Sequence, residues 1–257
     1  MTCTRRRQLL GWSALAAATG GCALTVPATR MPMDVTRLPG PCAGRAPALV
    51  VMLPGAYSRP QEFVDEGFVG ELRRRAVAAD IAIADAHVGY FQDRSAIRRL
   101  REDIVLPARA QGYRQVWLVG ISLGGFGALA FGARHGGEVD GILALAPYLG
   151  RRQLQKEIID AGGPARWRSA PHPREADDAE RDLWEWLAQP APPGPPVWLG
   201  FGRADRFADA HRMLANALPA GRSFDTPGGH DWPPWRALWN DWLDRRLLPE
   251  ACAGVAA

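Results

Sequence analysis

The sequence VWLVGISLGGFGALAFGARH, residues 116–135, decides the fold. It begins with a short apolar run typical of a buried strand and ends with an apolar segment of helix length. Between them lies a G-x-S-x-G motif, so Ser122 is predicted on a sharp strand-to-helix turn that exposes its hydroxyl. The flanking glycines leave room for neighbouring elements at this strained backbone. Because the chain has 28 glycines, the motif alone is weak evidence, and its context must support it.

The same alternation extends through most of the chain. Short apolar runs occur at residues 48–53, 81–86, 116–121, 139–145, 197–201 and around 223–226. Helices are expected between most of them, at residues 62–79, 95–110, 123–135, 206–218 and 234–247. Strands that alternate with helices imply right-handed crossovers, helices on both faces of a mostly parallel sheet, and ligands at the carboxyl ends of the strands. We therefore predict an α/β fold.

Composition narrows the class of protein further. The 257 residues are enough for one large domain or two small ones, and 47% hydrophobic and 23% charged residues are typical of a globular chain. These values exclude wholesale disorder, collagen and coiled coil. The formal net charge is +4, but three arginines lie together at residues 5–7, and the remainder is close to neutral. We therefore predict no nucleic-acid partner.

Residues 148–195 break the alternation. A helix at 153–161, a Gly-Gly-Pro break, a proline loop, a second helix at 175–188 and the segment QPAPPGPP are expected there. An insertion after a strand at the catalytic end is where a lid usually lies, so we predict a small lid; the alternative is an ordinary crossover helix with long loops. Trp184 and Trp186 are two residues apart and cannot share a helix face, so one of them is a candidate for the substrate pocket.

A serine nucleophile needs a base, and the base needs a carboxylate that orients it. Of the five histidines, His230 lies in the loop PGGHDW between the last strand and the final helix, and it is the predicted base. Asp205, in GFGRADRF after the penultimate strand, is the predicted acid. The alternative role for Asp205 is a helix N-cap, and Asp209 is then the reserve candidate.

The other histidines are predicted to be mostly structural. His135 ends the helix after Ser122, where it complements the helix dipole, His211 lies within a helix, and His172 lies in a proline loop. His87 follows the strand at 81–86 and is a candidate for contact with the substrate.

The motifs GISLGG, GRADRF and PGGHDW, in this order, resemble those of the α/β-hydrolase superfamily, and specifically of serine esterases, over residues 47–247. The resemblance implies an oxyanion hole formed by the backbone N–H of Leu123 and one from the loop LPGAYS. In this loop Pro54 stands where many members have histidine, which leaves the second donor open between Ala56 and Tyr57. The few strands before residue 48 indicate that one or both of the family's first two antiparallel strands are missing.

The resemblance implies a serine hydrolase that cleaves ester bonds in a small acyl substrate through an acyl-enzyme, without metal or cofactor. Peptidase, thioesterase and acyltransferase chemistry use the same triad and remain alternatives, as does a non-catalytic binding module of the cell envelope. The sequence makes no prediction of the oligomeric state.

The N-terminal segment resembles an export signal. Residues 5–7 are arginines followed by a short apolar run, so residues 1–21 are predicted to be a signal peptide of the bacterial twin-arginine or lipoprotein type, with Cys22 as the lipid acceptor. The protein is then exported to the periplasm or an outer membrane surface, and a lipid anchor is its only expected membrane contact. The alternative is a cytosolic protein with a frayed basic end.

The remaining segments are a linker at residues 22–46, with at most a short edge strand, and a tail at residues 248–257. Cys42 and Cys252 fall at the non-catalytic end of the predicted sheet, and in an oxidising compartment they are expected to form a disulfide; two free thiols are the alternative. Trp232 begins a tryptophan stripe predicted to pack the last helix on the sheet, and its proximity to His230 makes it a candidate for the pocket wall.

Overall fold

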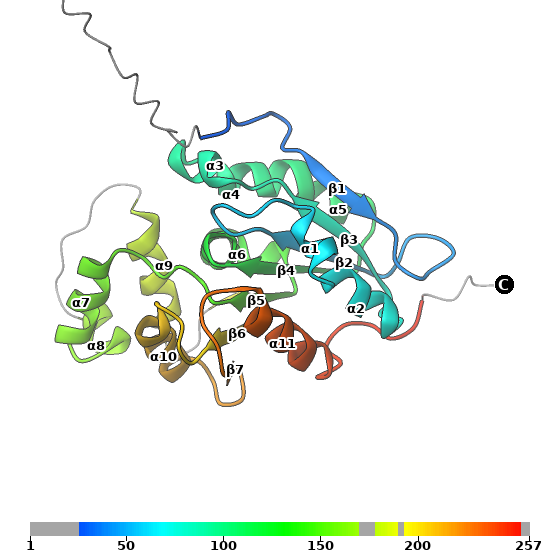
Figure 1. Cartoon of the computed structure of the whole chain (residues 1–257). Helices are drawn as coiled ribbons and strands as arrows, with labels where there is room; N and C mark the ends of the chain where they lie inside the picture. Colours follow the sequence, from blue (N-terminus) through cyan, green and yellow to red (C-terminus); the bar gives the residue numbers. More distant parts are fainter. Residues whose placement is uncertain (1–25, 170–177, 190–192, 253–257) are drawn as a thin grey trace, which may run out of the picture.

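The computed structural model describes residues 26–169, 178–189 and 193–252, and Figure 1 shows their arrangement. A seven-stranded sheet runs through the molecule in the order β1-β3-β2-β4-β5-β6-β7. Edge strand β1 pairs antiparallel with β3, and the other five pairings are parallel. The strands are β1 (Val35–Leu38), β2 (Ala48–Leu53), β3 (Ala79–Ala84), β4 (Gln115–Ile121), β5 (Gly141–Leu145), β6 (Val197–Gly202) and β7 (Ser223–Thr226).

Helices cover both faces of the sheet (Figure 1). They are α1 (Glu62–Asp65), α2 (Phe68–Arg74), α3 (Val88–Gln92), α4 (Ala96–Leu100), η1 (Arg101–Val105), α5 (Leu106–Ala110), α6 (Leu123–His135), η2 (Gly136–Glu138), α7 (Arg152–Asp160), α8 (Pro164–Ser169), α9 (Ala179–Leu187), α10 (Ala208–Ala217) and α11 (Trp232–Leu243).

Two hydrophobic cores lie on opposite faces of the sheet because successive side chains of a strand point to opposite sides. In β2, Leu49 and Val51 belong to the core under α4–α10, and Val50 and Met52 to the core under α1, α2 and α11. The whole strand is buried, which explains why it reads as a continuous apolar run.

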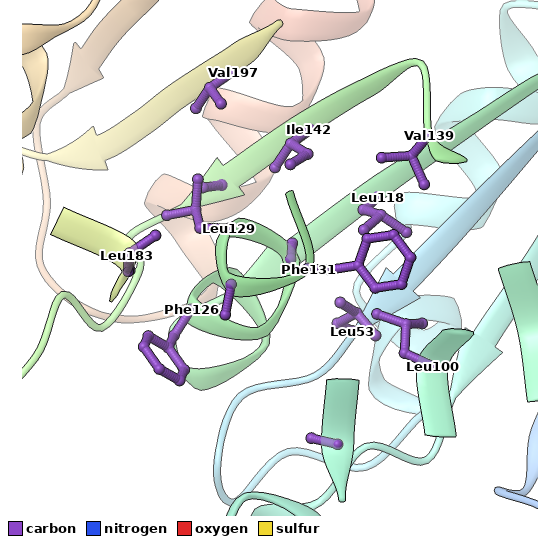
Figure 2. Close-up of a cluster of buried hydrophobic side chains, with 14 of the residues drawn as sticks. Leu53, Leu100, Leu118, Phe126, Leu129, Phe131, Val139, Ile142, Leu183 and Val197 are labelled. Carbon is purple, nitrogen blue, oxygen red and sulfur yellow. The ribbon is translucent and has the colours of Figure 1, made fainter. Parts of the chain in front are cut away.

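Figure 2 shows part of the first core, in which side chains from three strands meet two from α6: Leu53, Leu118, Ile142, Leu129 and Phe131. All five are fully or almost fully buried. This packing fixes α6, and with it the turn that carries Ser122, against the central strands.

β1 lies inside the predicted linker at residues 22–46 and is the short edge strand allowed there; among the described residues it is the only strand before β2. One feature at the N-terminal side corrects the sequence-based expectations. The helix expected at 62–79 is two helices separated at Gly67, whose φ of 82° breaks the helical backbone, and β3 already begins at Ala79.

A second difference lies in the helix expected at 95–110. It continues through these residues but contains the π-helical segment η1 just before Pro107. Proline has no N–H to donate to the preceding turn, which accounts for the local change in hydrogen bonding.

The region after β5 contains α7, α8 and α9, of which α8 was not expected from the sequence. Asp178 caps α9 by accepting a hydrogen bond from Arg181 N at 3.2 Å. The first residues of the helix expected at 175–188 lie outside the described chain, as does His172. α9 contacts both α6 and α8.

A disulfide joins Cys42 and Cys252 with 5.6 Å between their Cα atoms, and so ties the segment after β1 to the residues after α11. The predicted signal peptide and Cys22 lie outside the described chain. In the part that is described, no helix combines the length and apolar composition needed to span a bilayer.

Candidate active site

Ser122 lies on the turn between β4 and α6, with φ 54° and ψ −113°. This left-handed backbone is costly for a residue with a side chain, and it persists here because three backbone hydrogen bonds hold it. Ser122 N donates to Leu145 O at 3.0 Å, and Ser122 O accepts from Phe126 N at 3.1 Å and from Tyr148 N at 2.9 Å. The hydroxyl is thereby aimed away from the sheet at the carboxyl ends of the strands.

The glycines of the motif are required by close approaches of the backbone. A Cβ atom at residue 120 would lie 2.2 Å from Gly124 O, and one at residue 124 would lie 2.1 Å from Leu53 O. Both distances are far inside van der Waals contact. The G-x-S-x-G spacing therefore follows from the packing of the turn, as the sequence analysis predicts.

Three residues singled out by the sequence meet in one hydrogen-bonded chain. His230 Nε2 lies 2.9 Å from Ser122 Oγ, and His230 Nδ1 lies 2.7 Å from Asp205 Oδ2. A carboxylate can only accept, so Nδ1 carries the proton, and Nε2 is free to accept from the serine hydroxyl. The side chain of Asp205 is fully buried, and that of His230 is 9% exposed.

The Asp205 carboxylate is held ionised by its partners. Burial raises its pKa, but hydrogen bonds from His230 and from Phe207 N outweigh burial and hold the pKa below its ordinary value. Phe207 N donates to Oδ1 at 2.8 Å, while Oδ2 faces the histidine. The N-cap alternative is not borne out, because α10 begins at Ala208 and its N-cap residue is Phe207. Asp209, the reserve candidate, is an exposed partner of Arg212 and does not reach His230.

Two aromatic rings enclose the imidazole of His230. The Phe207 and Trp235 rings each lie 5.2 Å from it, close to perpendicular. Trp232, predicted for the pocket wall, instead packs edge-on against Phe63, Phe68 and Trp235. The final helix begins at Trp232, two residues earlier than expected, so Trp235 rather than Trp232 faces the histidine.

The loop predicted to complete an oxyanion hole lies beside the nucleophile. A Cβ atom at residue 55 would lie 3.6 Å from Ser122 Cβ. Ser58 N donates to Gly55 O at 3.1 Å, which closes a turn with Ala56 and Tyr57 at its two central positions. The Tyr57 side chain is 84% exposed and contributes no wall to the site. Leu123 begins α6, so its N–H lies at a helix N-terminus, which favours negative charge.

A cavity of about 460 Å³ opens next to Leu123. Its walls come from α3 and α4, from α6, and from the region after β5. None of the four predicted pocket residues, His87, Trp184, Trp186 and Trp232, lines this cavity. The cavity lies at the predicted catalytic edge of the sheet, but its lining residues differ from those predicted.

Trp184 and Trp186 are both core residues, with 0% and 4% of their surfaces exposed. Trp184 Nε1 donates to Leu149 O at 2.8 Å, and Trp186 Nε1 donates to Pro193 O at 2.9 Å. Their two-residue spacing does place them on different faces of α9. Both faces are covered because α9 packs against α6 and also against α8. The spacing of the two tryptophans could not show that both faces are buried.

The remaining described histidines have structural contacts. His87 caps α3 by accepting from Gly89 N through Nδ1 at 3.1 Å. His135 stacks at a tilt on Phe131, and burial lowers its pKa. His211 is buried, donates from Nε2 to Pro147 O at 2.9 Å, and has a pKa lowered by burial. Across the described residues, histidine, cysteine and carboxylate side chains form no metal-binding group.

The chain matches no protein-family model and no curated protein. It is similar to solved structures of Est1E from Butyrivibrio proteoclasticus (TM-score 0.56, 14% identity, 84% of this chain and 94% of that chain). A second similar structure is that of the serine hydrolase FphF from Staphylococcus aureus (TM-score 0.56, 12% identity, 83% of this chain and 90% of that chain). A third similar structure is that of an enol-lactonase from Burkholderia xenovorans (TM-score 0.53, 15% identity, 82% of this chain and 96% of that chain). These likenesses show that the chain has the α/β-hydrolase fold, which confirms the predicted fold class.

Proposed function

We propose that this protein is a serine hydrolase that cleaves carboxylic ester bonds, with Ser122 as nucleophile, His230 as general base and acid, and Asp205 as the residue that orients the histidine. The observation that carries the proposal is the continuous hydrogen-bonded chain from Asp205 Oδ2 through His230 to Ser122 Oγ, with distances of 2.7 and 2.9 Å. These distances are short enough for proton transfer without rearrangement.

The proposed reaction begins when His230 Nε2 takes the hydroxyl proton of Ser122 as Oγ attacks the ester carbonyl. The tetrahedral oxyanion collapses, the bond to the alcohol oxygen breaks, and His230 returns the proton to that oxygen. A water molecule, deprotonated by His230, then attacks the acyl-enzyme. The carboxylic acid leaves, and Ser122 recovers its proton.

Asp205 stabilises the positive charge of the imidazolium that His230 becomes in each step. Its carboxylate is buried, and its pKa is held below the ordinary value by the hydrogen bonds it accepts, so it stays negative while the histidine becomes positive. It also fixes the proton on Nδ1, which leaves Nε2 available to the serine.

The proposed oxyanion hole consists of the backbone N–H groups of Leu123 and Ala56. Leu123 N lies at the start of α6, directly after the nucleophile. Ala56 is half-buried in the turn that packs beside Ser122, whereas Tyr57 is largely exposed, which favours Ala56 over Tyr57 as the second donor. Each donor is expected to stabilise the transition state by about 3–4 kcal/mol.

The choice of an ester substrate is part of the proposal. Similar structures include a ferulic acid esterase and an S-formylglutathione hydrolase from Agrobacterium tumefaciens, so the fold is compatible with both ester and thioester substrates. The triad also serves peptidases and acyltransferases. A screen of p-nitrophenyl esters, thioesters and amides on the purified chain ranks these classes directly.

A fluorophosphonate probe tests the nucleophile. We expect the folded protein to be labelled, and Ser122→Ala to abolish labelling together with hydrolysis of p-nitrophenyl acetate. Ser223→Ala on β7 is the matched control, because it removes a partly buried serine hydroxyl away from His230. Absence of labelling in the folded wild-type protein would instead support a non-catalytic binding module.

We also propose export and lipid anchoring at Cys22, on the strength of the N-terminal sequence. The disulfide between Cys42 and Cys252 supports an oxidising compartment. Metabolic labelling with a radioactive fatty acid tests the anchor: label is expected in the membrane fraction of cells that express the full chain, and Cys22→Ser should remove it. Label retained in Cys22→Ser would contradict the proposal.

A further inference from the structure

The cavity is lined by Leu123, the residue directly after the nucleophile. Its lining residues come from α3, α4, α6 and the segment after β5, and none comes from the loops that carry Asp205 and His230. The leaving-group oxygen must be within reach of His230 Nε2, because this atom returns the proton to it. The alcohol part of an ester therefore occupies the side of His230, and the acyl part extends toward the cavity.

Aromatic rings form much of the apolar part of the cavity wall, and charged side chains of Arg94, Arg134, Arg151, Asp178 and Glu180 line the rest. Phe91 and Phe126 have ring centroids 6.2 Å apart at 51°, and Phe126 and Tyr148 have centroids 5.9 Å apart at 69°. Rings set at such angles present both edges and faces to a third ring, and aromatic pairs prefer these contacts at about 4.5–7 Å. The volume of about 460 Å³ falls in the range of small-molecule sites, roughly 300–1,000 Å³.

One wall of the cavity is fixed by the carboxylate of Glu180 at the start of α9. It accepts from Tyr148 Oη at 2.8 Å and from Arg151 N and Nε at 2.9 and 3.0 Å. Tyr148 is anchored at its other end, because its backbone N–H donates to Ser122 O. The ring of Tyr148 is thus held between the nucleophile turn and α9.

From this geometry we infer that the cavity is the acyl site of the proposed esterase and that it selects an acyl group with an aromatic ring over a linear alkyl group of the same carbon number. The inference rests on the proposed function. Tyr148 is a specificity-determining residue of this site, and Glu180 is a positioning residue that acts through it.

The test compares p-nitrophenyl 3-phenylpropanoate with p-nitrophenyl nonanoate, which share the leaving group and the carbon number of the acyl chain. We expect wild-type kcat/KM to be about tenfold higher for the aromatic ester, a ratio typical of apolar pockets. Ile97→Trp on α4 fills the cavity and should lower kcat/KM for the aromatic ester by about tenfold or more. Hydrolysis of p-nitrophenyl acetate should fall by a smaller factor, because an acetyl group is too short to extend into the cavity.

Ile159→Trp is the matched control, since Ile159 is 55% exposed on α7 and does not line the cavity. It should leave all three substrates unchanged. Ala179→Leu enlarges another side chain that lines the cavity and carries the test if Ile97→Trp does not fold, as judged by thermal unfolding.

Three results would overturn the inference: equal losses for acetate and the aromatic ester in both filled variants, a wild-type preference for nonanoate, or no preference between the two longer esters. Failure of the proposed function gives a different pattern, because then no ester is hydrolysed and Ser122 takes no fluorophosphonate. Hydrolysis of acetate without preference among the longer esters removes only the acyl site.

Discussion

Two buried aspartates near opposite ends of the sheet have different partners. Asp205 follows β6 at the carboxyl end and accepts from His230 Nδ1 and Phe207 N. Asp80 lies near the start of β3 and accepts from Gly40 N, Ala46 N and Tyr113 Oη at 2.7, 3.0 and 2.7 Å. Both are less than 10% exposed. Only Asp205 has a histidine as its partner, and imidazole is the side chain that most often takes up and returns a proton in catalysis, so a buried carboxylate becomes part of a reactive site through its neighbour.

The two ends also differ in what the hydrogen bonds hold together. At the amino end, Asp80 fixes residues 40 and 46 on either side of Cys42, whose disulfide reaches Cys252 in the tail. At the carboxyl end, the bonds converge on the side chain of a single strained residue, Ser122. The first arrangement secures the chain, whereas the second exposes a hydroxyl. Substitutions at the amino end should therefore affect stability, and those at the carboxyl end should affect turnover.

The largest expected effect is the loss of Ser122 or His230. Ser122→Ala and His230→Ala should each lower kcat by about 10⁶-fold, and the double variant should lose little more, because the triad acts as a unit. Steady-state kinetics and thermal unfolding of the three variants check this. A His87→Ala variant as inactive as His230→Ala would show that the base has been misassigned.

The second expected effect separates the two aspartates. Asp205→Asn should lower kcat by about 10⁴-fold, because the amide no longer fixes the histidine tautomer or stabilises its charge. Asp80→Asn should keep kcat and lower the free energy of unfolding by about 1–3 kcal/mol, the cost of weakening its three hydrogen bonds. Urea unfolding and kinetics on both proteins make the comparison. If Asp80→Asn lost turnover while remaining folded, the proposed division between the two ends would be wrong.

The third expected effect concerns the oxyanion donor. Ala56→Pro removes one N–H at the second position of the turn from residue 55 to 58, where proline is well tolerated. It should lower kcat by about 10²–10³-fold with little change in KM. An unchanged kcat in the folded variant would assign the donor to Tyr57.

The hydrogen-bonded chain of Ser122, His230 and Asp205 could be predicted because each residue follows a recognisable strand. Parallel strands bring their carboxyl ends to one edge, so Ser122, Asp205 and His230 could be assigned to one site from their order alone. The surrounding glycines made the turn at Ser122 recognisable as well, since its close backbone approaches exclude other residues.

The lining of the cavity could not be predicted because it depends on side chains from three separate segments. Tyr148 and Glu180 are 32 residues apart, and no local pattern indicates their hydrogen bond. The tryptophans of α9 were misassigned because the spacing of residues shows which helix faces differ but not which face is covered. The edge strand β1 was expected only without bounds within the linker, because it is short and only partly buried and carries little of the apolar pattern that identified the inner strands.

The fourth expected effect is confined to the amino end. Replacing both Cys42 and Cys252 by alanine should lower the free energy of unfolding by about 2–5 kcal/mol, because the disulfide restricts a long loop of the unfolded chain. Turnover at 25 °C should be unchanged. Reduction of the wild-type protein with dithiothreitol is the control and should give the same loss. A fall in kcat that accompanies full folding would show that the tail is coupled to the site.

The smallest expected effect is the loss of a hydrogen bond from a tyrosine hydroxyl to a carboxylate. Two such bonds can be compared: Tyr113 donates to Asp80, and Tyr148 donates to Glu180. Burial, followed by the adjacent carboxylate, raises the pKa of Tyr113 to about 12 and raises the pKa of Tyr148 above its ordinary value. Tyr113→Phe and Tyr148→Phe should each cost about 1 kcal/mol of stability at pH 8. Only Tyr148→Phe should also lower kcat/KM for the aromatic ester.

The pH dependence of this cost has a definite sign. Below about pH 10 both tyrosines are neutral in the folded and unfolded chain, so the stabilisation is fully present. As the pH rises from about 10 toward 12, the tyrosine ionises in the unfolded chain while folded Tyr113 stays neutral. Ionisation stabilises the unfolded wild-type chain and so lowers the free energy of unfolding. The phenylalanine variant has no hydroxyl at this position and does not undergo this loss. The difference in unfolding free energy between wild type and Tyr113→Phe should therefore shrink between pH 8 and pH 11 in urea titrations. A difference that grew with pH would mean that the folded state stabilises the phenolate, contrary to the hydrogen bond to Asp80.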